Sequence, residues 1–412
     1  MNMHFNSDSI RCDVAIVGGG VAGSSMAIAL ARAGRSVVLI EREAVFRDRV
    51  RGDSLFPWGA LEASRLGIAA LLPRSGARPL PIWQSYDGKS PNAPYRWRDD
   101  VPSGDVVWGV NHPGLQETLF AAAIEAGAMA LRPAKAVALG DAVDGHHRVV
   151  VSGPSGPLDI LARLVVGADG RESGVRKWIG AETIRDPLHH VIGGCLVADL
   201  DVEPDAAHRA NFPGGMSLIF RHANGNARAY VVCAPERAES MRGANAQSTF
   251  IALCASAFPD GAFARARSVG PAAFFPGIDV FASKIAGDRI VLIGDAAGAN
   301  DPSQGQGLSL TFRDVRELHS LLAEDDWDSA IAEFARRRPA WYEPLRALAM
   351  WVGPLVTDVG PAADEARERA AAAEAADPSL WGYAAIHALG PEGLPVSEAA
   401  RRHVLGEDVA AN

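Results

Sequence analysis

The stretch VAIVGGGVAG at residues 14–23, followed by VVLIE at residues 37–41, decides the fold of this chain. The pattern predicts a strand, a glycine turn, a helix, a second strand and an acidic residue. Gly18 permits the tight turn, Gly20 lets the backbone approach a pyrophosphate, and Gly23 lets the helix pack close to the strand. Glu41 stands at the separation from which a carboxylate accepts hydrogen bonds from a ribose diol. The stretch therefore predicts a dinucleotide site, and the alternative is a glycine-rich structural turn.

Composition narrows the class of protein. The 412 residues suggest two or three domains at about 150 residues each, and 48% hydrophobic residues supply a sizeable core. A net charge of −9 disfavours nucleic acid and anionic membranes as partners. The four cysteines are widely separated and form no CxxC pair, so we expect no metal site and a reducing, cytoplasmic location. We expect neither a targeting segment nor a membrane span.

Hydrophobic periodicity divides the rest of the chain into α/β, β-rich and helical parts. The Gly/Pro cluster at 153–157 separates two strands and predicts a hairpin. After residue 328 the pattern is helical and is interrupted by Pro339, Pro354, Pro361 and Pro378. Helices are expected at 21–32, 60–66, 114–126, 246–257 and 308–322, and strands at 148–152, 158–160, 164–167, 191–200, 216–221, 227–233 and 289–294.

Two further motifs follow the glycine turn. One is GADGRESGVR at residues 167–176, and the other is GDAA at 294–297 with Pro302, Gly305 and Gly307 behind it. Each begins at the end of an expected buried strand. In this order, over residues 14–322, the three motifs resemble those of the class A flavoprotein monooxygenases, the group typified by para-hydroxybenzoate hydroxylase.

The resemblance implies tightly bound, non-covalent FAD. It places Asp295 on the ribityl hydroxyls, with an N-cap as the alternative. It places Pro302 beside the isoalloxazine ring, and Gly305 and Gly307 at the pyrimidine end of that ring. The cofactor-binding residues expected in this way are Gly18, Gly20, Gly23, Glu41, Arg42, Arg51, Gln116, Val137, Asp169, Asp295, Pro302, Gly305 and Gly307.

Some of these assignments have open alternatives. Arg51 with Gly52 matches a segment in which relatives carry a hinge for the flavin, or it is a charged surface loop. Gln116 is a pyrophosphate contact or a solvated glutamine. Arg176 pairs with phosphate, braces Asp169, or belongs to a surface ion pair.

The fold class expected from the resemblance is α/β. It comprises a Rossmann-like FAD-binding domain, an inserted mixed β-sheet substrate domain and a C-terminal helical region. We expect the FAD-binding domain to be discontinuous, at 1–75, 104–182 and 282–327. Residues 76–103 and 183–281 would form the substrate domain, and 328–412 the helical region.

The chain departs from the family pattern near the expected flavin. Gly298 stands where the family usually has His, Gln304 where it has Gly, and Ser309 where it has Asn. His112 replaces a common Arg before the 114–126 helix. These changes put hydrogen bonding near the flavin in doubt without putting FAD binding in doubt.

The resemblance implies a monooxygenase that uses NAD(P)H and O₂ to hydroxylate or epoxidise a small organic substrate through a flavin C4a-hydroperoxide. The alternatives are a flavin-dependent reductase or saturase, a halogenase-like enzyme, and a non-catalytic FAD-binding protein. A monomer and a homodimer are both compatible with the sequence.

We assign no catalytic side chain, because the cofactor carries this chemistry. Five aromatic residues either line the substrate pocket or pack in the core. Four histidines include a candidate base or are structural, and two arginines either bind a substrate carboxylate or lie at solvated strand edges. The residues in these groups are Trp83, Tyr86, Phe220, Tyr230 and Phe274; His189, His190, His208 and His222; and Arg221 and Arg228.

Overall fold

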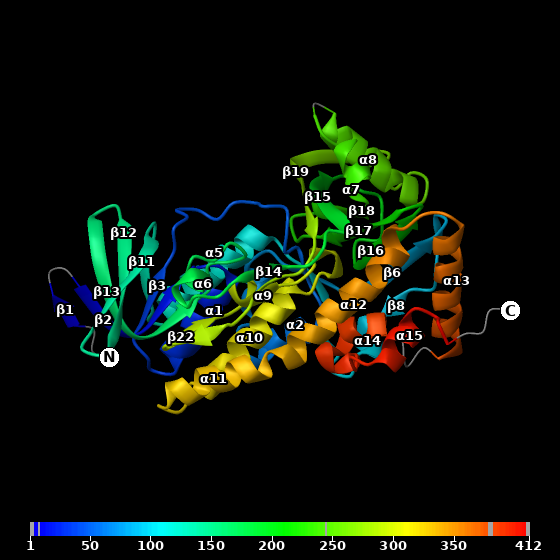
Figure 1. Ribbon diagram of the computed structural model, residues 1–412. Coiled ribbons are helices and arrows are strands. Elements are labelled where there is room, and N and C mark those ends of the chain that lie inside the picture. Colours follow the sequence, from blue (N-terminus) through cyan, green and yellow to red (C-terminus); the bar gives the residue numbers. More distant parts are fainter. Residues whose placement is uncertain (1–3, 7–8, 244, 378–381, 409–412) are drawn as a thin grey trace.

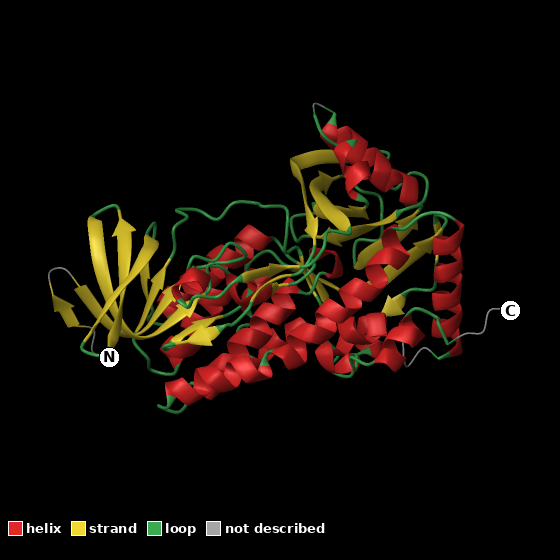
Figure 2. Ribbon diagram, in the orientation of Figure 1, coloured by secondary structure: helices red, strands yellow, loops and turns green. Residues whose placement is uncertain are grey.

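The computed structural model describes residues 4–6, 9–243, 245–377 and 382–408. Two large sheets lie toward opposite ends of an elongated molecule, and long helices run beneath them (Figures 1 and 2). This is the α/β fold that the sequence predicts. Among the described helices, none combines the length and the apolar character that crossing a membrane requires.

The first sheet is built around β2 (Ser9–Val17), which pairs in parallel with β3 (Val37–Ile40) and β13 (Gly156–Gly167). The order along the sheet is β10 (Met129–Leu131), β3, β2, β13, β12 (His146–Gly153) and β11 (Lys135–Val143). β22 (Ile290–Leu292) lies parallel to the end of β13. The expected strands at 158–160 and 164–167 are one continuous strand, β13. Its first half forms the predicted hairpin with β12 (His146–Gly153), and its second half enters the core.

One helix, α1 (Val21–Arg32), packs on this sheet, and two more helices pack on α1. These are α5 (His112–Glu125) and α10 (Gly307–Leu321). Eleven of the twelve α1 residues are buried, because helices and sheet enclose α1 on all sides. A glycine turn at the start of α1 therefore lies inside the molecule.

The second sheet has the order β19-β15-β18-β17-β16-β6-β7. Its centre consists of antiparallel β15 (His190–Ala198), β18 (Ala227–Cys233) and β17 (Gly215–Arg221). β6 (Ile82–Asp87) joins it in parallel beside β16 (Ala206–Phe212), so a segment far away in the chain completes the sheet. α8 (Ala246–Ala257) packs on its outer face against β19 (Arg267–Gly277).

The C-terminal part is helical, as expected. α12 (Pro339–Thr357) contacts β17 and β18 of the second sheet. α14 (Gly382–Leu389) contacts α2 (Pro57–Arg65), which packs against α10 beside the first sheet. Pro339 and Pro361 begin helices, but Pro354 lies inside α12 and does not end it, which corrects the expected interruption. Pro378 lies outside the described residues.

The remaining elements extend the two sheets or connect the layers. They are β1 (His4–Asn6), β4 (Ser54–Leu55), α3 (Leu71–Arg74), β5 (Arg78–Leu80), β7 (Ser90–Pro91), β8 (Tyr95–Arg96), α4 (Trp97–Asp100), β9 (Val107–Gly109), β10 (Met129–Leu131), β11 (Lys135–Val143), α6 (Val175–Trp178), β14 (Thr183–Arg185), α7 (Pro235–Glu239), β20 (Val280–Ala282), β21 (Ala286–Gly287), α9 (Asp295–Gly298), η1 (Pro302–Gln304), α11 (Trp327–Arg337), α13 (Pro361–Ala376), η3 (Pro391–Gly393) and α15 (Glu398–Val404).

Candidate active site

A cavity of about 1300 Å³, open mouth included, lies where the two sheets meet. Its walls come from the glycine turn, the loop at 50–54, the third motif and the inner face of the second sheet. One part of the lining is glycine-rich and polar, and another part is aromatic. A concave site of this kind, with convergent polar groups, is typical of small-molecule binding.

The glycine turn requires its glycines. Gly18 has φ +103°, and a Cβ added there would lie 2.3 Å from the Ala168 carbonyl oxygen. A Cβ on Gly23 would lie 1.8 Å from the Gly18 carbonyl oxygen. Gly20 lines the cavity directly before the first residue of α1. The turn therefore offers the free backbone amides at the start of α1 to an anionic group in the cavity.

The Glu41 carboxylate is buried beside this turn. It accepts hydrogen bonds from the backbone N–H of Gly19 and of Glu43, each at 2.7 Å. Ionised carboxylate oxygens have further lone pairs, so these bonds leave acceptor capacity for a diol. In this structure Glu41 ties the end of β3 to the glycine turn.

The second motif connects to the third. Asp169 accepts hydrogen bonds from the Gly174 backbone N–H at 2.7 Å and from the Ser173 hydroxyl at 2.5 Å, and so caps the turn into α6. Arg176 is buried and donates to the Ala296 carbonyl oxygen at 2.8 Å. Its guanidinium thus holds the GDAA segment, and the surface ion pair that we considered from the sequence is wrong.

The third motif is held from behind by the C-terminal helices. Gly294, at φ +56°, donates its N–H to Asp314 at 2.9 Å. Arg338 pairs with the same carboxylate at 3.0 Å, and both side chains are buried. Asp301 caps η1 through the Ser303 N–H. These contacts set the course of residues 294–307 along the cavity.

The structure gives physical reasons for the departures from the family pattern. A Cβ on Gly298 would lie 3.1 Å from atoms of Arg338, Phe281 and Tyr342. These three side chains occupy the space that a histidine at position 298 would need. A Cβ on Gly59 would lie 2.1 Å from the Ser309 hydroxyl, so α2 packs closely against α10 at the small Ser309.

His112, the replacement for a common Arg, is packed against the loop at 50–54. Its Nδ1–H donates to the Gly52 carbonyl oxygen at 3.2 Å. Burial lowers the pKa of His112 from its ordinary value, so the ring is neutral at pH 7. The side chain therefore brings no positive charge to the cavity that it lines.

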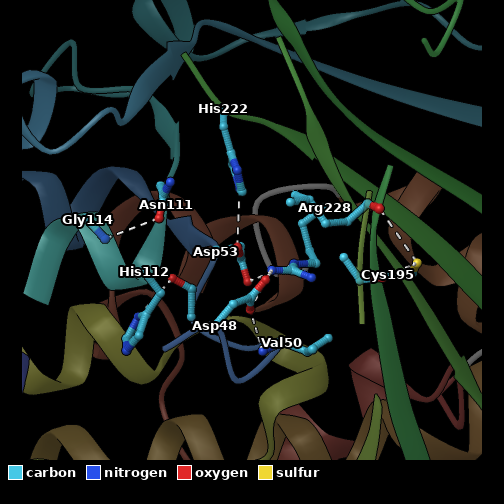
Figure 3. Close-up of polar contacts among 12 residues, drawn as sticks. Asp48, Val50, Asp53, Asn111, His112, Gly114, Cys195, His222 and Arg228 are labelled. Carbon is cyan, nitrogen blue, oxygen red and sulfur yellow. Dashed lines mark hydrogen bonds and ion pairs between the residues drawn. The ribbon is translucent and has the colours of Figure 1, made fainter. Parts of the chain in front are cut away.

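A buried charge cluster joins the loop at 48–53 to the second sheet (Figure 3). Asp53 accepts from the Tyr230 hydroxyl at 2.6 Å and lies 3.3 Å from Arg228 Nε and 3.2 Å from His222 Nε2. Arg228 also donates to Asp48 at 2.7 Å. Despite burial, these partners hold the pKa of Asp53 below its ordinary value. Nothing in the sequence indicated that Asp48 and Asp53 contact the second sheet.

The structure places the expected cofactor residues in three groups. Those that line the cavity are Gly20, Arg51, Gln116, Asp295, Pro302, Gly305 and Gly307. Those that support the lining from behind are Gly18, Gly23, Glu41 and Asp169. Arg42 and Val137 are solvent-exposed, at 60% of the side chain and 48% of the residue. Their roles toward FAD stay predictions.

The aromatic wall differs by one strand position from the expectation. Trp83, Phe220 and Tyr230 line the cavity, as does Phe275 rather than Phe274. Adjacent residues of β19 point to opposite faces, and Phe274 packs outward against Phe250 of α8. Tyr86 also lies in the outer core. His387, from α14, lines the cavity and was not foreseen.

The histidines and arginines that we considered for substrate chemistry have other partners. His189 lies near Asp358, His190 near Asp301, and His208 near Tyr86. Arg221 donates to the Leu200 carbonyl oxygen. Of the described residues that line the cavity, none is one of these four side chains, and none is a lysine.

These residues fit FAD. Gly20, Val21 and Ala22, at the start of α1, line the cavity together with Asp295, and a Cβ on Gly20 would meet only the Gln116 amide nitrogen, at 3.5 Å. Gly305, at φ +67°, lies against Phe56 and Ser54, so the backbone of the third motif passes close to the cavity. An elongated cofactor with a pyrophosphate, a polyol and a ring matches this sequence of groups.

Comparison with known proteins agrees with this geometry. Residues 11–330 match a family model described as FAD binding domain. The chain is 30% identical to ubiquinone hydroxylase UbiL from Rhodospirillum rubrum over 75% of this chain and 72% of that protein. It is 28% identical to menaquinone reductase from Mycobacterium tuberculosis over 78% of this chain and 80% of that protein. A match to squalene epoxidase ERG1 from Gibberella zeae covers only 26% of this chain and 22% of that protein.

The fold is also similar to solved structures. p-Nitrophenol 4-monooxygenase PnpA from Pseudomonas putida superposes with a TM-score of 0.74, at 21% identity, over 97% of this chain and 98% of that chain. The flavin-dependent brominase Bmp2 superposes with a TM-score of 0.68 at 16% identity, over 83% of this chain and 87% of that chain. At such identities the likeness concerns the fold alone.

Proposed function

Because the chain belongs to the FAD binding domain family, we propose that it is an FAD-dependent monooxygenase that hydroxylates or epoxidises a small organic substrate, with NAD(P)H and O₂ as co-substrates. The observation that carries the proposal is one cavity with a glycine-rich cofactor wall and an adjoining aromatic wall. Bound FAD would supply hydride acceptance and oxygen activation, and the protein supplies binding and orientation.

The cofactor wall binds and orients. The amides at Gly20 and the start of α1 would hold the pyrophosphate, and Asp295 would accept hydrogen bonds from the ribityl hydroxyls. Gly307 begins α10 and lines the cavity, so the positive end of that helix would face the pyrimidine edge of a flavin bound there. Backbone amides there would stabilise negative charge on a reduced ring.

The aromatic wall excludes water. Ile192, Leu218 and Phe220 come from β15 and β17 of the second sheet. Trp83 comes from β6 of the same sheet, and Phe56 directly precedes α2. Apolar side chains around the reacting centre keep a substrate dry and prevent unproductive release of reduced oxygen. The neutral His112 fits this environment.

The test is isotopic. Purified protein should contain FAD, should oxidise NADH or NADPH faster when a substrate is present, and should incorporate ¹⁸O from ¹⁸O₂ into the product. Asp295→Ala should lose FAD, whereas Asp328→Ala, an exposed carboxylate paired with Arg289, should retain it. Protein without FAD, or turnover without ¹⁸O in any product, would refute the proposal.

The reductase alternative is favoured by one observation, the 28% identity to menaquinone reductase. A reductase would transfer hydride equivalents to a substrate double bond or quinone without consuming O₂. Anaerobic turnover therefore separates the two functions: the monooxygenase stops without O₂, and a reductase continues.

A further inference from the structure

We propose that Tyr230 and Gln304 are two hydrogen-bond acceptors at opposite ends of an aromatic belt, and that they select a planar substrate with hydrogen-bond donors at both of its ends. The inference rests on the proposed function, since it concerns the substrate part of the same cavity. Neither residue has a cofactor role in the assignments above.

The aromatic belt consists of Tyr230, Phe220, Trp83, Phe56 and His387, all of which line the cavity. Successive ring centroids lie 6.4, 6.4, 6.1 and 4.4 Å apart. Contacts between rings at such distances are favourable in themselves, and the belt presents ring faces and edges to a ligand. A planar, apolar molecule is the shape that such a surface binds best.

At the first end of the belt, the Tyr230 hydroxyl already donates its proton to a protein acceptor. It donates to Asp53 at 2.6 Å, and Arg228 and His222 lie within 3.3 Å of the same carboxylate. Burial and the neighbouring carboxylate raise the pKa of Tyr230 well above its ordinary value, so the phenol stays protonated. The Tyr230 oxygen can therefore only accept a hydrogen bond from a ligand.

At the second end, the Gln304 side chain is held in one orientation. Its Nε2 donates to the Ser303 hydroxyl at 3.2 Å, and its Oε1 lies on the other side of the amide. Gln306 and His387 both donate to the Gln304 carbonyl oxygen, at 3.0 and 3.1 Å, so the backbone is fixed as well.

The oxygen of the Gln304 side-chain amide has no partner in the described part of the chain. The residue is 3% exposed, and Oε1 has no hydrogen-bond partner among the described residues. A buried acceptor without a partner is costly, and a donor on a ligand removes that cost. Gln304 replaces the family's glycine, so this acceptor belongs to this chain rather than to the general pattern.

The experiment measures binding to the FAD-loaded protein by equilibrium dialysis, with 2,6-dihydroxynaphthalene and 2,6-dimethoxynaphthalene as probes. The two have the same ring system, but only the first has hydroxyl donors at both ends. We expect the dihydroxy probe to bind at least about tenfold more tightly. Tyr230→Phe and Gln304→Met should each reduce this preference about three- to tenfold, the range for one net hydrogen bond. Tyr95→Phe, a tyrosine outside the cavity lining, should leave the preference unchanged.

Equal binding of the two probes to the native protein would overturn the inference. A preference that survives in either variant would also overturn it. One such outcome is a Gln304→Met protein whose FAD absorbance shifts while the preference stays, because Gln304 would then bond to the flavin and not to the probe. If Tyr230→Phe does not fold, the native comparison and Gln304→Met decide. Failure of the ¹⁸O₂ test with this preference intact would refute the monooxygenase proposal and leave the acceptor pair standing.

Discussion

Replacing Gly298 by alanine tests how the C-terminal helices support the third motif. An added Cβ would lie 3.1 Å from atoms of Arg338, Phe281 and Tyr342. None of these neighbours can move easily: Arg338 is paired with Asp314, Tyr342 donates to Asp279 at 2.9 Å, and Phe281 lies in β20. The strain therefore outweighs the gain in helix propensity, and we expect a loss of about 1–3 kcal/mol.

The measurement is urea unfolding of the FAD-loaded protein, together with the FAD content after gel filtration. Gly298→Ala should lower the unfolding midpoint and should release part of the FAD, because Gly298 ends the segment that begins with Asp295. Gly298→His, which restores the family's residue, should be worse, since the whole ring has to fit where a single methyl is already crowded.

Gly287→Ala is the matched control. Nothing lies within 4 Å of the added Cβ there, and that glycine is not in the left-handed region, so the change should be neutral or slightly stabilising. If Gly298→Ala were as stable as Gly287→Ala, or if Gly298→His retained full FAD, our explanation of this departure from the family pattern would be wrong.

Two further predictions concern buried charges. Asp314→Ala should destabilise the protein by about 3–5 kcal/mol in urea unfolding, because it leaves Arg338 buried without its partner. Asp328→Ala, at an exposed carboxylate, should hardly change the unfolding midpoint. Similar small effects of both substitutions would contradict the stabilising role of the Asp314–Arg338 pair. Burial lowers the pKa of His112 in the folded protein. In the unfolded chain the same side chain takes up a proton near the ordinary pKa of 6.5, so the free energy of unfolding should fall as the pH drops below about 6.5. His112→Gln should reduce this pH dependence of the unfolding midpoint, and an unchanged slope would show that other groups cause it.

Much of the cofactor wall could be predicted because its requirements are local. A glycine turn between a strand and a helix depends on residues a few positions apart, so Gly18, Gly20 and Gly23 are recognisable without the fold. The same holds for Asp295 and Gly305, which follow a buried strand and precede a helix. The structure places Gly20, Asp295 and Gly305 on one cavity.

The substrate part could not be predicted in the same way, because it depends on strand phase and on distant contacts. Phe274 and Phe275 are indistinguishable by residue type, and only the pairing of Ile192 with Phe275 in β15 and β19 decides which ring faces the cavity. A shift by one residue in a strand exchanges its two faces. His387 reaches the cavity only because α14 packs against α2.

The sequence by itself determined the α/β fold and the dinucleotide turn, since backbone conformations that need glycine and the alternation of strand and helix are recorded in neighbouring residues. Only the tertiary structure decided which polar atoms are used up and which are offered to a ligand. Tyr230 donates to Asp53 across 177 residues of chain, and Gln304 is held by His387 across 83. Hydrogen-bond donors and acceptors are paired by proximity in space, so their remaining capacity is set only when the two sheets and the C-terminal helices have come together.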